Sequence, residues 1–212
     1  MYYAVSISGH PNGDKHCVGA ATAKSVIGPY KAEDKPLVCP DLGAIDAAPY
    51  KEDGKYYIVY KVNGYYETGT PLMLQPLNDD ALTVKGDPIF LIDRDERDGP
   101  DIEAPSLHKE GDTYILTFSS NVFDSPLYDV SWATAPALKG PYSKTNDGPL
   151  LVTGAQSNVG PMVAPGGAAF SESHKGKKIV FHAFKNGVDI KEGRAMFTAD
   201  VDFSGIIMMV KE

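Results

Sequence analysis

The sequence has few of the features that mark zinc proteins, membrane proteins and nucleic-acid-binding proteins. Of its 212 residues only two are cysteines, Cys17 and Cys39, and no Cys/His cluster has the spacing of a structural zinc site. The longest apolar stretches, such as Gly205–Val210, are far shorter than the roughly 20 residues that span a bilayer. Lys and Arg number 20 against 28 Asp and Glu, a net charge of −8 with no basic segment. We therefore expect neither nucleic acid nor a membrane as a partner.

The N-terminus lacks the pattern of a signal peptide, a basic segment followed by an apolar run. It begins Met1-Tyr2-Tyr3-Ala4-Val5, which has the pattern of a strand with no turn before it. We therefore expect a chain without a targeting signal that starts inside a strand.

The two cysteines leave two interpretations open. A disulfide between Cys17 and Cys39 would close a loop of about 21 residues and stabilise the fold by roughly 3 kcal/mol through lost chain entropy. Alternatively, both are buried thiols that behave as small apolar side chains.

Composition indicates one globular domain. Hydrophobic residues make up 42% of the chain, aromatic residues 10% and charged residues 23%. The 21 glycines and 16 prolines are spread along the chain, so no segment has the composition of a linker.

Strand-like runs recur along the chain at similar intervals. They begin at Tyr2, Tyr56, Tyr114 and Ile179. The first and third copies also match without a gap in a single register. In the register that aligns Tyr2 with Tyr114, Ala21-Thr22-Ala23 repeats as Ala133-Thr134-Ala135, and Gly28-Pro29-Tyr30 repeats as Gly140-Pro141-Tyr142.

Each copy is predicted to hold further strands. The second strands are Val18–Ala23, Leu72–Leu77, Val130–Ala135 and Ala195–Val201; the third follow a proline at Leu37-Val38, Ile89–Ile92 and Leu150–Val152. An inner strand precedes each aromatic run, with turns such as Glu52-Asp53-Gly54. Four short antiparallel strands in a period of about 55 residues are typical of a β-propeller blade. A β-sandwich is the alternative, but it has no reason to repeat at this interval.

We therefore expect an all-β propeller that forms a single domain over residues 1–212. Its repeats are predicted at approximately 1–42, 43–98, 99–158 and 159–212.

Two of the inner strands each place one acid among apolar residues. Asp46 precedes Tyr56 and Glu103 precedes Tyr114 at nearly the same interval, which is one residue longer for Glu103. Because inner strands line a propeller axis, we expect the two carboxylates to converge on one pocket. Burial favours the neutral form of a carboxyl group, and paired carboxyl groups are what cleavage of a glycosidic bond requires. The alternatives are that these acids bond backbone amides or bind a central cation. The acidic run at 93–98 is expected to form a solvated turn.

At these residues the chain resembles glycoside hydrolase family 43, the five-bladed propellers that include β-xylosidases, α-L-arabinofuranosidases and arabinanases. Segment 43–60 is similar to the family's third-blade motif, whose Asp modulates the pKa of the general acid and orients it. Segment 103–121 is similar to the fourth-blade motif, whose Glu is the general acid. The resemblance implies Glu103 as general acid and Asp46 as its modulator.

The resemblance extends to segments 160–167 and 181–195, which are similar to the family's last blade. It implies that His182 holds a central calcium or its water shell and that Arg194 contacts the sugar. No other cofactor is implied. Alternatively, His182 is a strand histidine satisfied by the core, and Arg194 pairs with a carboxylate. The chain has Pro165-Gly166-Gly167 where the family commonly has Gly-Pro-Gly-His.

Three aromatic residues near the acid are candidate sugar contacts: Phe123, Tyr128 and Trp132. Aromatic faces stack on the apolar faces of sugar rings. Trp132 lies in a second strand, where a place in the core is the alternative.

One element of the family pattern has no counterpart. The family's general base is an Asp in the inner strand of the first blade, whereas this chain begins inside what corresponds to the second blade. The sequence thus predicts about four blades, without the first-blade base, and blade edges through which copies of the chain could associate. The resemblance also implies an extracellular location.

Two functions follow from the sequence. The first is hydrolysis of arabinose- or xylose-containing polysaccharide or oligosaccharide, weak or lost if no base is supplied. The alternative is a non-catalytic carbohydrate-binding propeller or remnant of the same family.

Overall fold

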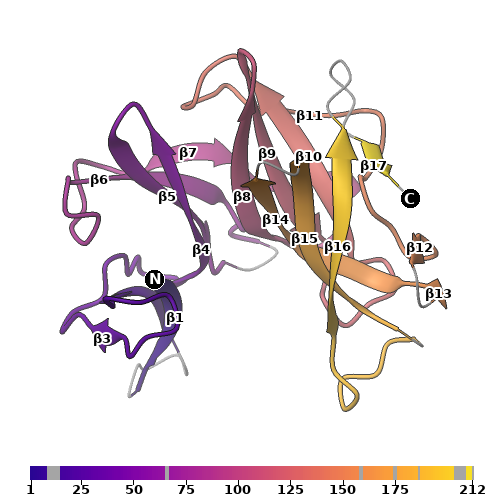
Figure 1. Ribbon diagram of the computed structural model, residues 1–212, viewed down its shortest axis with the longest axis horizontal. Helices are drawn as coiled ribbons and strands as arrows, with labels where there is room; N and C mark the ends of the chain where they lie inside the picture. The colour runs from indigo at the N-terminus through magenta and orange to yellow at the C-terminus, as the bar shows by residue number, and fades with distance from the viewer. Residues whose placement is uncertain are drawn as a thin grey trace. The chain divides into compact units, whose positions relative to one another are not determined.

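The computed structural model describes residues 1–8, 15–64, 67–157, 160–173, 176–185, 187–202 and 209–211. In these residues every regular element is a β-strand except one short 3-10 helix, η1 (Glu96–Asp98) (Figure 1). None of the described helical segments is long and apolar enough to cross a membrane. The chain comprises two compact units, Met1–Asp93 and Arg94–Glu212, and each holds two sheets of the kind that the repeat predicts.

The first unit contains a three-stranded and a four-stranded antiparallel sheet. The three-stranded sheet has the order β1 (Tyr2–Ile7), β2 (Lys15–Thr22), β3 (Lys31–Ala32). The four-stranded sheet has the order β4 (Ala44–Glu52), β5 (Lys55–Val62), β6 (Leu72–Leu77), β7 (Ile89–Ile92). Strand β4 lies beside β1 and β2. The core of this unit forms there from Val18, Ala44, Ile58, Tyr60 and Leu77.

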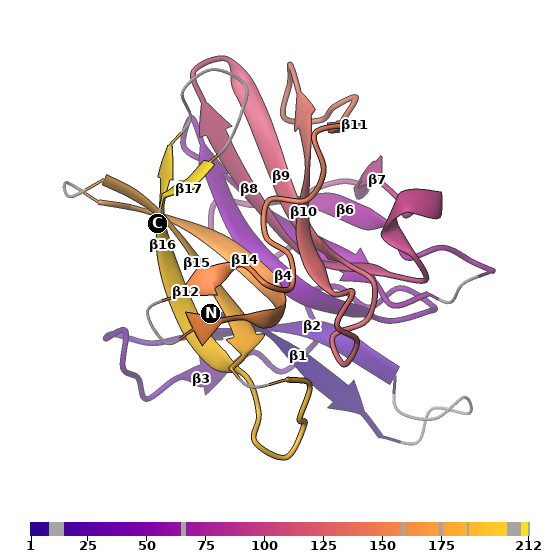
Figure 2. The ribbon, with the colours of Figure 1, turned by 90° about the vertical axis from the view of Figure 1, so that its right-hand side faces the viewer.

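The second unit contains two four-stranded antiparallel sheets (Figure 2). One consists of β8 (Ile102–Glu110), β9 (Thr113–Ser120), β10 (Asp129–Ala135) and β11 (Ser143–Lys144). The other consists of β14 (Val163–Ser173), β15 (Gly176–Phe184), β16 (Ala195–Asp202) and β17 (Met209–Lys211). Between them in sequence lies a small ribbon of β12 (Gln156–Ser157) and β13 (Gly160–Pro161).

The two sheets of the second unit pack face to face through alternate residues. Strand β14 lies beside β8, β9 and β10. Ile115 and Trp132 from one sheet join Ile179 and Phe181 from the other in one buried cluster. Ile179 and Phe181 are two residues apart, so both point to the same face of β15. This packing fixes β8 and β14, which carry the candidate site, against each other.

Most of the predicted strands are confirmed, and two third strands are wrong. The runs at Tyr56 and Tyr114 form β5 and β9, and the predicted Leu72–Leu77 and Ile89–Ile92 are strands with those bounds. By contrast, Val38 and Leu151 make only isolated bridges, and the third strands are β3 and β11. Both lie at the sheet edge, and β3 is exposed, so their residues need no apolar pattern that would reveal them in the sequence.

The internal repeat is visible in local geometry as well as in sequence. Gly28 and Gly140 have positive φ angles of 84° and 88°, a backbone region in which glycine meets no steric penalty. Two residues later, the Tyr30 hydroxyl donates to the Val26 carbonyl oxygen and the Tyr142 hydroxyl donates to that of Leu138. The matched residues therefore build the same turn twice.

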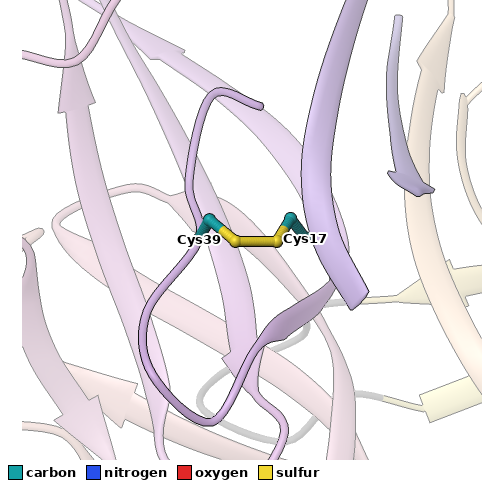
Figure 3. The surroundings of a disulfide bond; sticks show 2 residues. All are labelled: Cys17 and Cys39. Carbon is teal, nitrogen blue, oxygen red and sulfur yellow. A yellow bond between two sulfur atoms is a disulfide. The ribbon is translucent and has the colours of Figure 1, made fainter. Parts of the chain in front are cut away.

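Cys17 and Cys39 form a disulfide, which decides between the two interpretations of the pair (Figure 3). Cys17 is fully buried on β2, and Cys39 lies 22 residues later in the segment that returns to pair with this strand. The disulfide therefore ties this returning segment to the sheet of β1–β3.

We predict that the double variant Cys17→Ala/Cys39→Ala unfolds at a lower urea concentration than the oxidised wild type. Opening a loop of this length should cost about 3 kcal/mol, because the unfolded chain regains conformational entropy. Reduced wild type is the control and should match the variant. If unfolded, unreduced wild type reacts with two equivalents of iodoacetamide, the disulfide is absent.

Candidate active site

The candidate site is built on β-bulges near the beginnings of the inner strands. The register of β4 shifts between Ile45 and Ala48, and that of β8 shifts between Glu103 and Ser106. Inside each bulge one residue other than glycine has a positive φ angle: Asp46 at 57° and Ala104 at 51°. Such a bulge re-aims the neighbouring side chains and costs about 1–3 kcal/mol of backbone strain.

The bulges show how closely the positions of the two acids correspond. Asp46 occupies the positive-φ position of its bulge, whereas Glu103 immediately precedes that position, which Ala104 occupies. The acids thus stand one residue apart in matching bulges, as their slightly unequal intervals to Tyr56 and Tyr114 suggested. Asp46 belongs to the first unit and Glu103 to the second, so their convergence on one pocket stays a prediction.

Glu103 has a defined partner in the second unit. The Tyr128 hydroxyl donates to Glu103 Oε1 at 2.5 Å, a length typical of a strong phenol–carboxylate hydrogen bond. Tyr128 is only 2% exposed and directly precedes β10. Sequence reasoning placed Tyr128 against a sugar ring, but burial leaves its ring no face for stacking on a sugar.

Arg194 joins three segments around this pair. Its guanidinium lies over the rings of Tyr128, at 5.2 Å, and Phe184, at 4.7 Å. Its N–H groups donate to the carbonyl oxygens of Phe123, Ala164 and His182. The alternative for Arg194, pairing with a carboxylate, is not among its hydrogen bonds in the described residues; its donors bond backbone oxygens and His182.

His182 accepts a hydrogen bond from this arginine. Arg194 Nε donates to His182 Nδ1 at 2.5 Å. Burial and the positive charge of Arg194 both hold the pKa of His182 below its ordinary value. At neutral pH the imidazole is therefore uncharged, and because Nδ1 accepts, the ring proton belongs on Nε2.

This arrangement does not fit the calcium ligand that the family resemblance implied. One ring nitrogen of His182 accepts from Arg194 and the other carries the proton, so neither has a lone pair for a metal. Calcium also takes six to eight oxygen ligands. Within the described ranges no group of three or more His, Cys, Asp or Glu side chains could hold a metal ion. His182 in this state cannot ligate calcium directly, whereas its contact with the water shell of the ion stays a prediction.

The other candidate sugar contacts differ in exposure. Trp132 is 4% exposed and belongs to the core cluster with Ile115 and Phe181, so burial supports its core alternative. Phe123 is 48% exposed and can still meet a ligand. A hollow of about 350 Å³ is lined by Arg194 together with Phe184, Lys185 and Glu192.

Two glycines make room for the site. A Cβ atom at Gly166 would overlap the Tyr128 ring, and one at Gly167 would overlap the His182 ring. The Gly167 N–H donates to Ser119 Oγ at 2.8 Å, and Ser119 faces Glu103 across the β8–β9 pair. Sequence reasoning noted this glycine pair only as a departure from the family pattern and missed Ser119. The adjacent glycines were the signal that bulky groups approach the backbone here.

A second cluster of charges lies in the same unit, where a solvated turn was expected. That expectation is wrong for Asp98, which is 3% exposed. Its carboxylate contacts Lys144 Nζ and accepts a hydrogen bond from Ser120 Oγ at 3.2 Å. Asp95 and Asp98 form a capping box around η1, and the Asp-x-x-Asp spacing was the sequence signal for it.

Asp129 lies next to this cluster. It is 8% exposed and accepts a hydrogen bond from Ser131 Oγ at 2.8 Å. Burial raises the pKa of Asp129 to about 6, and the negative charge of Asp98 acts in the same direction. Asp129 begins β10, so its titration bears on the stability of the sheet that holds Glu103.

Comparison with known proteins assigns the family. Residues 1–206 match the family described as glycosyl hydrolases family 43, so the chain belongs to that family. A search among curated protein sequences finds no match to it.

Solved structures with the same fold come from the same class of protein. The chain is 26% identical to a thermostable family-43 glycoside hydrolase, with a TM-score of 0.82 over 100% of this chain and 70% of that one. An α-L-arabinofuranosidase from Lactobacillus brevis is 16% identical, with a TM-score of 0.78 over 99% of this chain and 70% of that one. A Cellvibrio cellulosa α-L-arabinanase in complex with arabinohexaose is 18% identical, with a TM-score of 0.72 over 99% and 72%. The all-β sheets described above are thus those of the family-43 propeller.

We predict that Asp129 contributes to the stability of wild type at low pH and that this contribution is lost as the pH rises from about 4 to above 6. Asp129 has a higher pKa in the folded protein than in the unfolded chain, so its protonated form stabilises the fold. The stabilisation is complete below the unfolded pKa and is lost as the pH rises past the folded pKa of about 6. At 1.36 kcal/mol per pKa unit the loss amounts to about 3 kcal/mol. Urea unfolding of wild type and Asp129→Asn from pH 4 to 8 measures it.

The variant should lack this loss and gain stability relative to wild type at pH 8. Asp200→Asn, at an exposed ion pair with Lys178, is the control and should follow the wild-type curve. Parallel curves for wild type and Asp129→Asn over the whole range would contradict the assignment.

We also predict that calcium does not stabilise the protein through His182. The shift in the thermal unfolding midpoint between EDTA and excess calcium should be the same in wild type and His182→Ala, because removal of a residue that does not hold the ion leaves its binding unchanged. A rise with calcium that disappears in His182→Ala would show that the histidine does bind the ion.

Proposed function

We propose that this chain is a glycoside hydrolase-type propeller that acts on arabinose- or xylose-containing polysaccharide or oligosaccharide. Glu103 is its general acid, and Asp46 modulates the pKa of that acid. The named activities of the structural relatives on arabinan and arabinofuranosides support this substrate class.

The contact between Tyr128 and Glu103 carries the proposal. Glu103 is half-buried beside a strained bulge and accepts the Tyr128 hydroxyl at 2.5 Å. The negative charge of Glu103 acts to raise the pKa of both Arg194 and His182, so a guanidinium cation and a neutral imidazole lie close to this carboxylate. A carboxyl group held in one orientation within a polar, partly buried site suits the transfer of a proton to a leaving glycosidic oxygen.

Hydrolysis also needs a second carboxylate. In an inverting mechanism one carboxyl group protonates the leaving oxygen while another activates water on the opposite face of the sugar ring. The sequence predicts no counterpart of the family's base among these residues. The alternative function is therefore carbohydrate binding without turnover at the same site, and the assay below separates the two.

We predict that Glu103→Gln lowers kcat/KM on an arabino- or xylo-oligosaccharide, whose leaving sugar hydroxyl needs a proton, by roughly 10²- to 10⁴-fold, the usual contribution of a general acid or base. Gln keeps the size of the side chain but cannot deliver the proton. The matched control is Glu110→Gln in the same strand, whose carboxylate pairs with Lys177 and His108 away from Tyr128.

Equal activity of wild type, Glu103→Gln and Glu110→Gln would remove Glu103 from the mechanism. If all three are inert but calorimetry shows that wild type binds arabinohexaose or xylohexaose, the binding function replaces the hydrolase.

A further inference from the structure

We propose that Tyr128 is a positioning residue for Glu103: its hydroxyl holds the carboxylate in one orientation and does not contact the sugar. This inference rests on the proposed function of Glu103. It replaces the role of sugar platform that the sequence suggested for Tyr128.

The hydrogen bond supplies the first step. Glu103 has three rotatable side-chain bonds, and the Tyr128 hydroxyl ties one of its oxygens at 2.5 Å. With Oε1 held, the plane of the carboxyl group and the direction of Oε2 are restricted. Orientation of this kind matters because displacing a catalytic group by about 1 Å can reduce a rate by about 10²-fold.

Two contacts hold the Tyr128 ring in place. The ring occupies the space that a Cβ of Gly166 would fill, so the absence of a side chain at this position makes room for it. The Arg194 guanidinium lies over the ring, 5.2 Å from its centroid. A phenol ring confined in this way presents its hydroxyl at a fixed point.

The Arg194 guanidinium is anchored by hydrogen bonds to three different segments. It donates to the backbone before β10 at Phe123, to Ala164 in a bulge of β14, where the register with β15 shifts between Val163 and Gly166, and to β15 at His182. The ring of Phe184 covers it at 4.7 Å. The chain of contacts from β15 through Arg194 and Tyr128 to Glu103 is therefore continuous.

The backbone that carries Tyr128 is fixed by its own contacts. The Tyr128 N–H donates to the Ser125 carbonyl oxygen at 3.0 Å. Thr153 Oγ1 donates to the Pro126 carbonyl oxygen and also accepts from the Ala164 N–H, which ties this segment to the same bulge. Tyr128 thus belongs to the rigid part of the site.

The test compares Tyr128→Phe with wild type. Phe keeps the ring, its packing against Gly166 and its contact with Arg194, and removes only the hydroxyl. We expect kcat to fall by about 10- to 100-fold with KM little changed, since the acid is misplaced and the sugar contacts are intact. Gly166→Ala, whose Cβ would displace the Tyr128 ring, should also reduce kcat.

The control is Tyr142→Phe. This variant also removes a buried hydroxyl, which donates to the Leu138 carbonyl oxygen at 3.1 Å, in the same unit of the chain. It should lower the melting temperature and leave kcat unchanged. A structural effect of losing any buried tyrosine hydroxyl is thereby separated from positioning.

A second readout does not need turnover. In a double-mutant cycle of Tyr128→Phe and Glu103→Ala, each of which removes one partner of the hydrogen bond, the shifts in unfolding midpoint should fail to add. The same cycle with Tyr142→Phe and Glu103→Ala should be additive.

Additive shifts for Tyr128→Phe and Glu103→Ala would overturn the inference, and so would an unchanged kcat in Tyr128→Phe when Glu103→Gln is inactive. If Glu103→Gln keeps wild-type turnover, the proposed function fails instead. The cycle then still decides whether Tyr128 holds Glu103.

Discussion

The guanidinium of Arg194 is the interaction on which the candidate site depends. A half-buried cation must have its donors satisfied, and Arg194 does so with the carbonyl oxygens of Phe123, Ala164 and His182 and with the imidazole of His182. Because these acceptors come from three segments, the arginine fixes the segments relative to one another. The Tyr128 ring beneath it is fixed as a consequence, and through that ring so is Glu103.

The bulges are the second constraint, and they explain why the site lies near the beginnings of the inner strands. Ala104 and Ala164 adopt positive φ angles of 51° and 54°, which residues with a Cβ rarely do. The surrounding sheet offsets this strain, since β8 and β14 each pair with a long neighbouring strand. As a result Glu103 is turned toward Tyr128, and the Ala164 carbonyl oxygen is turned toward Arg194.

Sequence reasoning succeeded where a pattern is repeated and apolar, and it failed where an interaction is specific to one partner. The aromatic runs at Tyr56 and Tyr114 predicted β5 and β9, because short repeated runs of aromatic and branched residues are typical of strands. The short edge strand β3 carries no such pattern and was missed. Tyr128 was assigned to the sugar because an aromatic residue near an acid looks the same in sequence whether its ring is exposed or buried.

The sequence by itself determined the repeat, the strands that fill the core and the family to which the chain belongs, because these depend on residue types at regular spacing. Only the tertiary structure decided that Cys17 and Cys39 are bonded, that His182 accepts from Arg194, and that Tyr128 holds Glu103. Each of these contacts joins residues that are far apart in the sequence. Such contacts arise from the way neighbouring strands and sheets pack. They cannot be predicted from the spacing of residues along the chain.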